Sequence, residues 1–335
     1  MSNFENSELI LQSLSPLWPF LKDDNFEILI NRPQEVWVDN KEGMKSYAVE
    51  ALTESFNEGL LSLLASSKKK HLNAEHPILK DTWKNEATGA RWRITGVIPP
   101  VSNHVNMSFR RLRAVPMKDE DLLAGHYFEK EKLGFEKTLL QEKFEIFSPV
   151  TESRYEFILN AIHEKKNIVI SGSTGSSKTQ FLNWCLTKIP SHERIITIED
   201  TEELVITQPN HTQLFYPDDI TQSSTQIDAS RLLKTALRLK PDRIIMGEVR
   251  GIELVDMLES ANTGHPGTFV TLHADSPQKA FLRMRQILMR VYPQQQAAML
   301  DEWLFDRIDI VVQCKRQGGV FFIDDIWEKC SGKNS

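Results

Sequence analysis

Residues 167–189 read NIVISGSTGSSKTQFLNWCLTKI, and this stretch decides the fold of the second half of the chain. It begins with a short apolar run typical of a buried strand and continues into a helical pattern that ends before Pro190. A loop rich in Gly and Ser lies between the two. A strand, a loop of small residues and a helix in this order predict one repeat of a parallel α/β sheet.

The loop has the composition of a phosphate-binding loop. Small residues let successive backbone N–H groups turn inward, the helix contributes its N-terminus, and a lysine reaches the β- and γ-phosphates. The threonine hydroxyl then ligates Mg²⁺. We therefore expect ATP and Mg²⁺ to bind here, with Thr179 as a metal ligand. The predicted nucleotide-binding residues are Gly172, Ser173, Thr174, Gly175, Ser176, Ser177, Lys178 and Thr179.

Ser177 stands where such loops usually carry glycine. A Cβ atom at this position crowds the loop near the phosphates, which can weaken or slow the site without abolishing it. We expect the substitution Ser177→Gly to keep or raise ATPase activity.

Strand-like and helix-like runs alternate through the rest of this half, which is typical of a parallel sheet covered by helices on both faces. A hairpin with Gly-Gly at its turn closes the chain. The expected elements are strands at 194–198, 243–247 and 268–272, helices at 178–189, 229–240, 277–290 and 294–305, and a hairpin from 308 to 327.

Acidic residues and a histidine follow three of these strands. The run IEDTEE (198–203) follows the first strand, and Glu248 follows the second. His273 follows the third strand, and the segment TGHPG (263–267) comes directly before that strand. Ligands of open α/β sheets sit at the carboxyl ends of the strands. We therefore expect the ends of four neighbouring strands to gather round one triphosphate.

Hydrolysis of a phosphoanhydride requires one carboxylate to orient or deprotonate water and another to hold Mg²⁺ or its waters. We assign Glu203 to the water. Glu248 is assigned to the magnesium shell, because it ends the strand expected beside the phosphate loop. His273 is a candidate sensor of the γ-phosphate. The remaining acids of the run either cap the following turn or pair with arginine at a subunit interface: Glu199, Asp200 and Glu202.

The first part of the chain predicts a smaller domain of mixed α/β structure. Apolar residues at helical spacing occupy 49–67, between runs rich in aliphatic and aromatic residues at 26–30, 35–39 and 91–98. The predicted organisation is an N-terminal domain at 1–125, a Glu- and Lys-rich linker at 126–152 and an ATPase domain at 153–335.

Composition excludes several classes of protein. The chain has 335 residues, with 40 Lys and Arg against 46 Asp and Glu, for a net charge of -6. This balance argues against direct nucleic-acid binding through bulk charge. Three cysteines without C-x-x-C spacing argue against zinc and against disulfides. The N-terminus is acidic and no long apolar run occurs, so we expect a cytoplasmic protein that meets a membrane only peripherally.

Four segments in this order resemble a known family. The phosphate loop, IITIEDTEEL, PDRIIMGEVRG and TGHPGTFVTLHADS are similar to the Walker A, Asp box, Walker B and His box of the secretion ATPase superfamily. Within it, the chain most resembles the VirB-type hexameric traffic ATPases of type IV secretion and conjugation systems. The resemblance covers about residues 150–315, and more loosely INRPQEVWVD (30–39) and GARWRITGVIPP with MSFRR (89–111).

This resemblance implies a RecA-like P-loop NTPase domain that powers translocation or pilus biogenesis as a homohexameric ring. It also implies docking on inner-membrane secretion channel components at the cytoplasmic face. The nucleotide would lie between the two domains, and arginines of the N-terminal domain would reach the γ-phosphate. The matching positions are Arg91 and Arg110, with Arg93 and Arg111 as near neighbours.

Three other readings stay open. Pilus and type II secretion motors share the four boxes, although many of them carry a tetracysteine zinc module that this chain lacks. A nucleotide-gated subunit with little turnover would be consistent with Ser177. A helicase or recombinase of RecA type is opposed by the acidic balance and by the lack of an aromatic and basic stripe.

Overall fold

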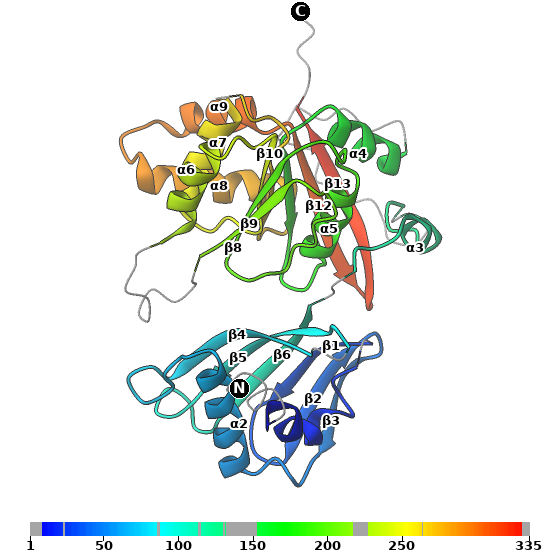
Figure 1. Cartoon of the computed structure of the whole chain (residues 1–335). Coiled ribbons are helices and arrows are strands. Elements are labelled where there is room, and N and C mark those ends of the chain that lie inside the picture. The colour runs from blue at the N-terminus through cyan, green and yellow to red at the C-terminus, as the bar shows by residue number, and fades with distance from the viewer. Residues whose placement is uncertain are drawn as a thin grey trace, which may run out of the picture. The chain divides into compact units, whose positions relative to one another are not determined.

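A computed structural model describes residues 9–22, 24–85, 88–112, 115–129, 131, 153–216, 227–262 and 264–329. The chain forms two compact units, and the second begins at Val115. Most of the predicted linker, namely residues 130 and 132–152, lies outside the described residues, as does Thr263 of the TGHPG segment. The mixed α/β architecture expected for the chain is confirmed in both units (Figure 1).

The first unit is built on a six-stranded sheet in the order β3-β2-β1-β6-β5-β4, with neighbouring strands antiparallel. Helix α2 packs on one face, where Leu61 and Leu64 join a core with Ile28, Trp92 and Phe109. The elements are η1 (Ser15–Leu17), β1 (Asn25–Ile30), β2 (Glu35–Asn40), β3 (Gly43–Ala48), α2 (Glu54–Ser67), β4 (Ile78–Lys84), β5 (Arg91–Val97) and β6 (Asn106–Leu112).

Helix α2 begins five residues later than the apolar spacing from Val49 predicts. Thr53 adopts an extended backbone, and its hydroxyl oxygen accepts a hydrogen bond from the backbone N–H of Phe56 at 3.2 Å. A threonine that satisfies one of the first N–H groups in this way fixes the start of a helix. The cap therefore decides the boundary, and the apolar residues before it belong to the preceding turn.

The second unit holds a seven-stranded sheet in the order β13-β12-β7-β11-β10-β8-β9. Neighbouring strands run parallel, except for β12 and β13, which form the predicted hairpin. The elements are α3 (Asp119–Ala124), α4 (Arg154–His163), β7 (Ile168–Gly172), α5 (Lys178–Thr187), β8 (Ile195–Glu199), β9 (His211–Phe215), α6 (Ala229–Leu237), β10 (Arg243–Met246), α7 (Glu253–Asn262), β11 (Phe269–Leu272), α8 (Pro277–Val291), α9 (Ala297–Arg307), β12 (Ile310–Gln317) and β13 (Val320–Glu328).

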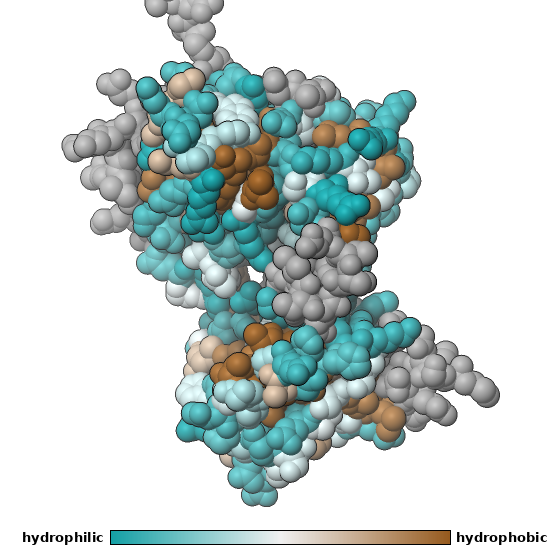
Figure 2. Space-filling model, turned by 90° about the vertical axis from the view of Figure 1, so that its left-hand side faces the viewer, coloured by the Kyte–Doolittle hydropathy of each residue, from teal (hydrophilic) through white to brown (hydrophobic). Residues whose placement is uncertain are grey.

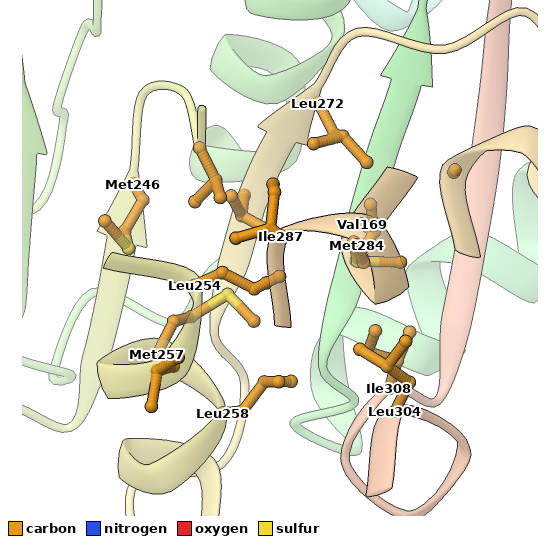
Figure 3. Close-up of a cluster of buried hydrophobic side chains, with 14 of the residues drawn as sticks. Val169, Met246, Leu254, Met257, Leu258, Leu272, Met284, Ile287, Leu304 and Ile308 are labelled. Carbon is orange, nitrogen blue, oxygen red and sulfur yellow. The ribbon is translucent and has the colours of Figure 1, made fainter. Parts of the chain in front are cut away.

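Helices cover both faces of this sheet, as the alternation of elements predicts. Alternate residues of each buried strand point to opposite faces. On one face Val169 and Met246 pack against Leu254, Ile287 and Leu304, from helices α7, α8 and α9 (Figure 3). The opposite face packs against α3, α4 and α5 through a second apolar cluster. A parallel sheet buried on both sides explains why its strands read as short continuous apolar runs.

The strand order corrects one expectation. The four strands expected to carry the site are neighbours, in the order β7-β11-β10-β8. However, β11 lies directly beside β7, the strand that leads into the phosphate loop, and β10 is one strand further away. Glu248 therefore does not end the strand next to the phosphate loop. The expectation was wrong because local patterns do not encode which strands pair.

Four described elements of the second unit have no counterpart among the predicted ones, namely α3, α4, β9 and α7. Strand β9 is half-exposed at the edge of the sheet, so it lacks the continuous apolar run of a buried strand. On the face of the molecule shown in Figure 2, most of the surface is hydrophilic and is interrupted by small hydrophobic patches. Among the described helices, none combines the length and the apolar character that crossing a membrane requires.

Candidate functional site

The phosphate loop connects β7 to α5, as predicted, and its backbone requires small residues at two points. A Cβ atom on Gly172 would lie 2.2 Å from Oγ of Ser176 and 2.6 Å from the backbone carbonyl oxygen of Cys314. Gly175 has a positive φ of 72°. A side chain at Gly172 would collide with a backbone oxygen of the neighbouring strand, so this position admits only glycine.

The N-terminus of α5 lies at the end of this loop. Its cap residue, Ser177, adopts a left-handed conformation with φ 66° and ψ 23°, and its side chain makes no capping hydrogen bond to the helix. The first N–H groups of a helix have no partner within the helix, and together with the helix dipole they form a binding site for anions. The loop and the start of α5 are thus suited to receive phosphate oxygens, through residues that include Thr179.

Lys178, at the first position of α5, is buried with only 7% of its surface exposed. Its ammonium group donates hydrogen bonds to the backbone carbonyl oxygens of Gly172 and Ser173, both at 2.9 Å. A third contact runs to Nδ1 of His273 at 3.3 Å. The lysine that the sequence assigns to the β- and γ-phosphates is therefore held against its own loop and against the end of β11.

His273 connects the phosphate loop to Glu248. A lysine ammonium can only donate, so Nδ1 of His273 accepts, and the neutral ring then carries its proton on Nε2. Nε2 lies 3.3 Å from Oε1 of Glu248. Three residues predicted independently from the ends of three strands are therefore joined in one continuous polar chain, Lys178 to His273 to Glu248.

Arg250 extends this chain, and it is not among the site residues predicted from the sequence. Its Nη2 lies 2.8 Å from Oε2 of Glu248 and 3.2 Å from Oδ2 of Asp200. Asp200 thus pairs with an arginine of the same chain. The signal for Arg250 was its position two residues after Glu248, within the same segment at the end of β10.

Glu248 is held as a carboxylate. Burial would raise its pKa, but hydrogen bonds from His273 and Arg250 and the charge of Arg250 lower it to about 2. Glu199, at the end of β8, behaves in the opposite way. Only 1% of its surface is exposed, and this burial raises its pKa to about 7 against the effect of its hydrogen bonds. Two acids at neighbouring strand ends therefore have pKa values on opposite sides of the ordinary value.

Glu203 lies in a segment that is fastened on both sides. Oε2 of Glu199 accepts hydrogen bonds from the backbone N–H groups of Glu203 and Leu204, both at 2.8 Å. Glu199 therefore caps the following turn, one of the two roles considered for it. From helix α5, Asn183 donates to the carbonyl oxygen of Glu203 at 3.1 Å and accepts from the N–H of Val205 at 2.9 Å. These bonds hold the backbone of Glu203 to the helix that begins at the phosphate loop.

The two candidate arginines belong to the first unit. Arg91 begins β5 and is opposite Leu112 in the register of β5 and β6. Arg110 lies in β6, where its Nη2 is 3.2 Å from a carboxylate oxygen of Glu27 on β1. The role of both arginines at the γ-phosphate stays a prediction.

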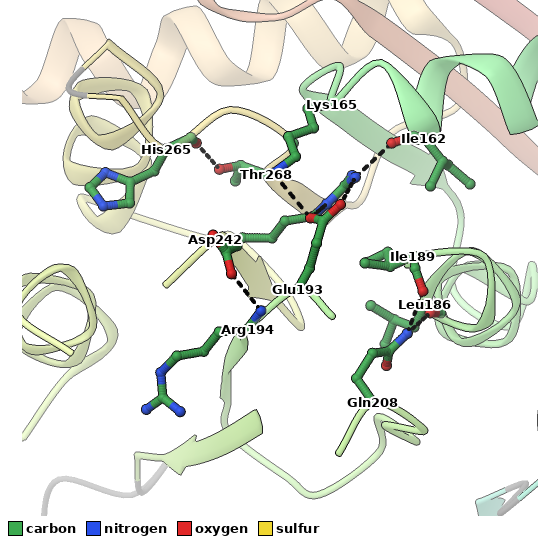
Figure 4. Close-up of polar contacts among 12 residues, drawn as sticks. Ile162, Lys165, Leu186, Ile189, Glu193, Arg194, Gln208, Asp242, His265 and Thr268 are labelled. Carbon is green, nitrogen blue, oxygen red and sulfur yellow. Dashed lines mark hydrogen bonds and ion pairs between the residues drawn. The ribbon is translucent and has the colours of Figure 1, made fainter. Parts of the chain in front are cut away.

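A buried ion pair lies at the other end of the strands of this sheet, where the strands begin. Arg243, the first residue of β10, is fully buried and donates to both carboxylate oxygens of Glu193, at 2.7 and 3.2 Å. Figure 4 labels Glu193 and two further members of the cluster, Ile162 and Lys165. Arg243 also donates to the carbonyl oxygen of Ile162 at 2.8 Å, and Lys165 lies 3.3 Å from Glu193. This charged cluster ties α4 and the start of β10 together, far along the strands from the phosphate loop.

The chain is similar to known secretion proteins. Residues 134–313 match the family model described as type II/IV secretion system protein. The chain is 35% identical to the type IV secretion system protein VirB11 of Bartonella henselae, in an alignment that covers 96% of this chain and 94% of the relative.

Two solved structures share the fold. The ATPase DotB of Yersinia pseudotuberculosis superposes with a TM-score of 0.60 at 16% identity, covering 97% of this chain and 79% of that one. The pilus retraction motor PilT with bound ADP superposes with a TM-score of 0.58 at 21% identity, covering 92% and 77%. The predicted fold class, a RecA-like ATPase domain preceded by a smaller mixed α/β domain, is confirmed by this likeness.

Proposed function

The chain belongs to the type II/IV secretion system protein family, and on this basis we propose that it is an ATP-hydrolysing motor of a bacterial type IV secretion or conjugation apparatus. The observation that carries the proposal is the polar chain from Lys178 through His273 to Glu248 at the ends of three neighbouring strands. It joins a phosphate loop to a carboxylate. Phosphoryl transfer depends on this combination of positioned charge and hydrogen-bond donors.

ATP would bind with its phosphates on the loop and on the N-terminus of α5. Lys178 would exchange its hydrogen bonds to Gly172 and Ser173 for bonds to the β- and γ-phosphates, because phosphate oxygens are stronger acceptors than neutral carbonyl oxygens. The same exchange would release Nδ1 of His273. The histidine would then respond to the presence of the γ-phosphate, as its position at the end of β11 allows.

The residues present fit Mg²⁺. Glu248 is a carboxylate whose pKa of about 2 keeps it ionised at every physiological pH, and Thr179 offers a hydroxyl in the first turn of α5. Oxygen donors of these two kinds are those that Mg²⁺ prefers. When bound, Mg²⁺ neutralises charge that develops on the phosphates. Thr179 would contact the ion directly, and Glu248 would hold it or its waters.

Glu203 would orient or deprotonate the attacking water. Its backbone is held by Glu199 on one side and by Asn183 on the other, so its position relative to α5 is fixed. A water-activating group requires such positioning, because a small displacement of the reacting groups costs a large factor in rate.

The motor would act as a homohexameric ring, with head-to-tail contacts between subunits that close on themselves. The ring would dock on channel components at the cytoplasmic face of the inner membrane.

Arg91 and Arg110 would supply positive charge to the γ-phosphate, a contribution of about 10³–10⁵ in rate in well-studied systems. R91A and R110A should each lower kcat at least tenfold, and an unchanged kcat in both would rule the arginines out of the reaction.

The decisive experiment measures steady-state phosphate release. We expect near-complete loss in K178A and at least a tenfold loss in E203Q and E248Q, as when a main contributor to a charged transition state is removed. E202Q is the matched control, since it neutralises the exposed acid beside Glu203 and should stay within about twofold of the wild type. Equal rates for E203Q and the wild type would move the water-activating role to another acid.

A second candidate function rests on Ser177. Its left-handed conformation is disfavoured for any residue with a Cβ atom. A loop strained in this way can bind ATP and hydrolyse it slowly. The chain would then be a nucleotide-gated subunit of the same apparatus. ATP binding without phosphate release by the purified wild-type protein would favour this alternative and exclude the motor.

A further inference from the structure

The hydroxyl of Ser177 has a partner outside the phosphate loop. Its Oγ lies 3.2 Å from the hydroxyl oxygen of Tyr127. The two residues are 50 positions apart in the chain, and Tyr127 belongs to the segment that follows α3. No part of the phosphate-loop motif accounts for this contact.

Tyr127 is held rigidly. Only 4% of its surface is exposed, and its ring packs against those of Phe128 and Phe181, with ring centroids 5.5 and 6.0 Å away. Its backbone carbonyl accepts a hydrogen bond from the N–H of Ile323 on β13 at 2.7 Å. The hydroxyl therefore occupies a fixed point beside the sheet.

The hydroxyl of Tyr127 reaches the base of the loop. It donates to Sγ of Cys314 at 4.0 Å, and Cys314 is the residue of β12 that lies opposite Gly172 in the sheet register. Burial raises the pKa of Tyr127, so the group remains a neutral hydroxyl. A buried hydroxyl is costly to leave without partners, and Ser177 and Cys314 supply them.

Ser177 needs such a partner more than a glycine would. A residue with a Cβ atom is strained at φ 66°, so right-handed values are intrinsically favoured unless a contact holds it. Relaxation at this position would turn the N–H groups at the start of α5, which are the groups proposed to bind the phosphates.

We propose that Tyr127 is a positioning residue of the phosphate loop, whose hydroxyl holds Ser177 in the left-handed conformation that ATP binding requires. The inference rests on the proposed function, since it assigns the loop to ATP. It explains how this chain keeps a working loop with serine where glycine is usual. It also makes the segment after α3 part of the nucleotide site, although that segment touches no phosphate.

The test is a double-mutant cycle with Y127F, S177G and the double variant Y127F/S177G. ATP affinity is measured by isothermal titration calorimetry and kcat by phosphate release at saturating ATP. Y127F should weaken ATP binding about fivefold, the size expected for one neutral hydrogen bond, and should leave kcat within about twofold. In the S177G background Y127F should have no further effect, because no strained residue remains to be held.

Y155F is the matched control. Tyr155 belongs to the same aromatic cluster, with its ring 5.3 Å from that of Phe128, and its hydroxyl bonds to Asp119 away from the loop. Y155F should therefore leave the affinity for ATP unchanged. Thermal unfolding of each variant verifies that it is folded.

Three results would overturn the proposal: unchanged affinity in Y127F, an equal loss caused by Y127F with and without S177G, or an equal loss in Y155F. Failure of the proposed function itself has a different signature. In that case the wild type would not bind ATP, or K178A would bind it as tightly as the wild type.

Discussion

The ammonium nitrogen of Lys178 lies 3.3 Å from Nδ1 of His273. The lysine starts the helix after β7, and the histidine follows β11, which is the strand paired with β7. Because the ammonium group donates, the histidine is neutral at Nδ1 and presents its other nitrogen to Glu248. A change at the phosphate loop can therefore reach the acid at the end of β10 through a single side chain.

The first prediction concerns this link. H273F removes both ring nitrogens, so it should lower kcat for ATP hydrolysis at least tenfold while the protein stays folded, because a contributor of hydrogen bonds to a charged site is lost. H211N, a change at an exposed histidine of the edge strand β9, is the control and should leave kcat within about twofold. The measurement is steady-state phosphate release, and an unchanged kcat in H273F would remove the histidine from the mechanism.

The second prediction separates the strain at Ser177 from its hydroxyl. S177A and S177G both remove the hydroxyl, but only S177A keeps a Cβ atom at φ 66°. S177G should therefore be more stable than S177A by about 1 kcal/mol, the cost of the left-handed conformation for a residue with a side chain. Urea unfolding at equilibrium measures the difference. Equal stabilities would mean that the loop relaxes and stores no strain.

The third prediction concerns pH. Glu199 has a pKa of about 7 in the folded protein and an ordinary pKa of 4.5, so between these values the unfolded chain loses its proton while the folded chain keeps it. Stability should therefore fall as the pH rises from 4.5 to 7, by about 3 kcal/mol from this group. E199Q resembles the protonated form and should remove this part of the decline. Unfolding free energies of both proteins between pH 5 and 8 test it, and parallel curves would contradict it.

The fourth prediction concerns the buried ion pair. R243M leaves the carboxylate of Glu193 buried beside Lys165 alone, which should destabilise the protein by about 3–5 kcal/mol. The double change R243M/E193L removes both charges and should be less destabilising than R243M. Chemical denaturation provides the comparison. Under conditions in which they are folded, both variants should bind ATP with unchanged affinity. The pair lies where the strands begin, and the phosphate loop lies where they end.

Local patterns predicted most elements of the second unit. The strand before the phosphate loop, helix α5 and the closing hairpin lie within one or two residues of their expected bounds. They were predictable because each carries its own signal, such as the apolar run of a buried strand or the Gly-Gly of a tight turn. Strand β9 was not, because a half-exposed edge strand carries no such run.

The presence of acids at the strand ends was predictable from the sequence, but the pKa of each acid was not. Glu199 and Glu248 both follow buried strands and look alike in the sequence. Their pKa values differ because Glu248 faces His273 and Arg250, whereas Glu199 faces two backbone N–H groups in a buried turn. Such neighbours come from other strands and helices, so they are known only once the strands are paired.

The sequence alone determined that the chain carries a phosphate loop on a parallel α/β sheet, because the spacing of small, apolar and charged residues within about 20 positions specifies a strand, a turn and a helix. The tertiary structure decided that His273, and not Glu248, meets Lys178, and that Tyr127 meets Ser177 across 50 residues. Strand order and side-chain packing depend on contacts between segments distant in the chain, and local periodicity carries no information about those contacts.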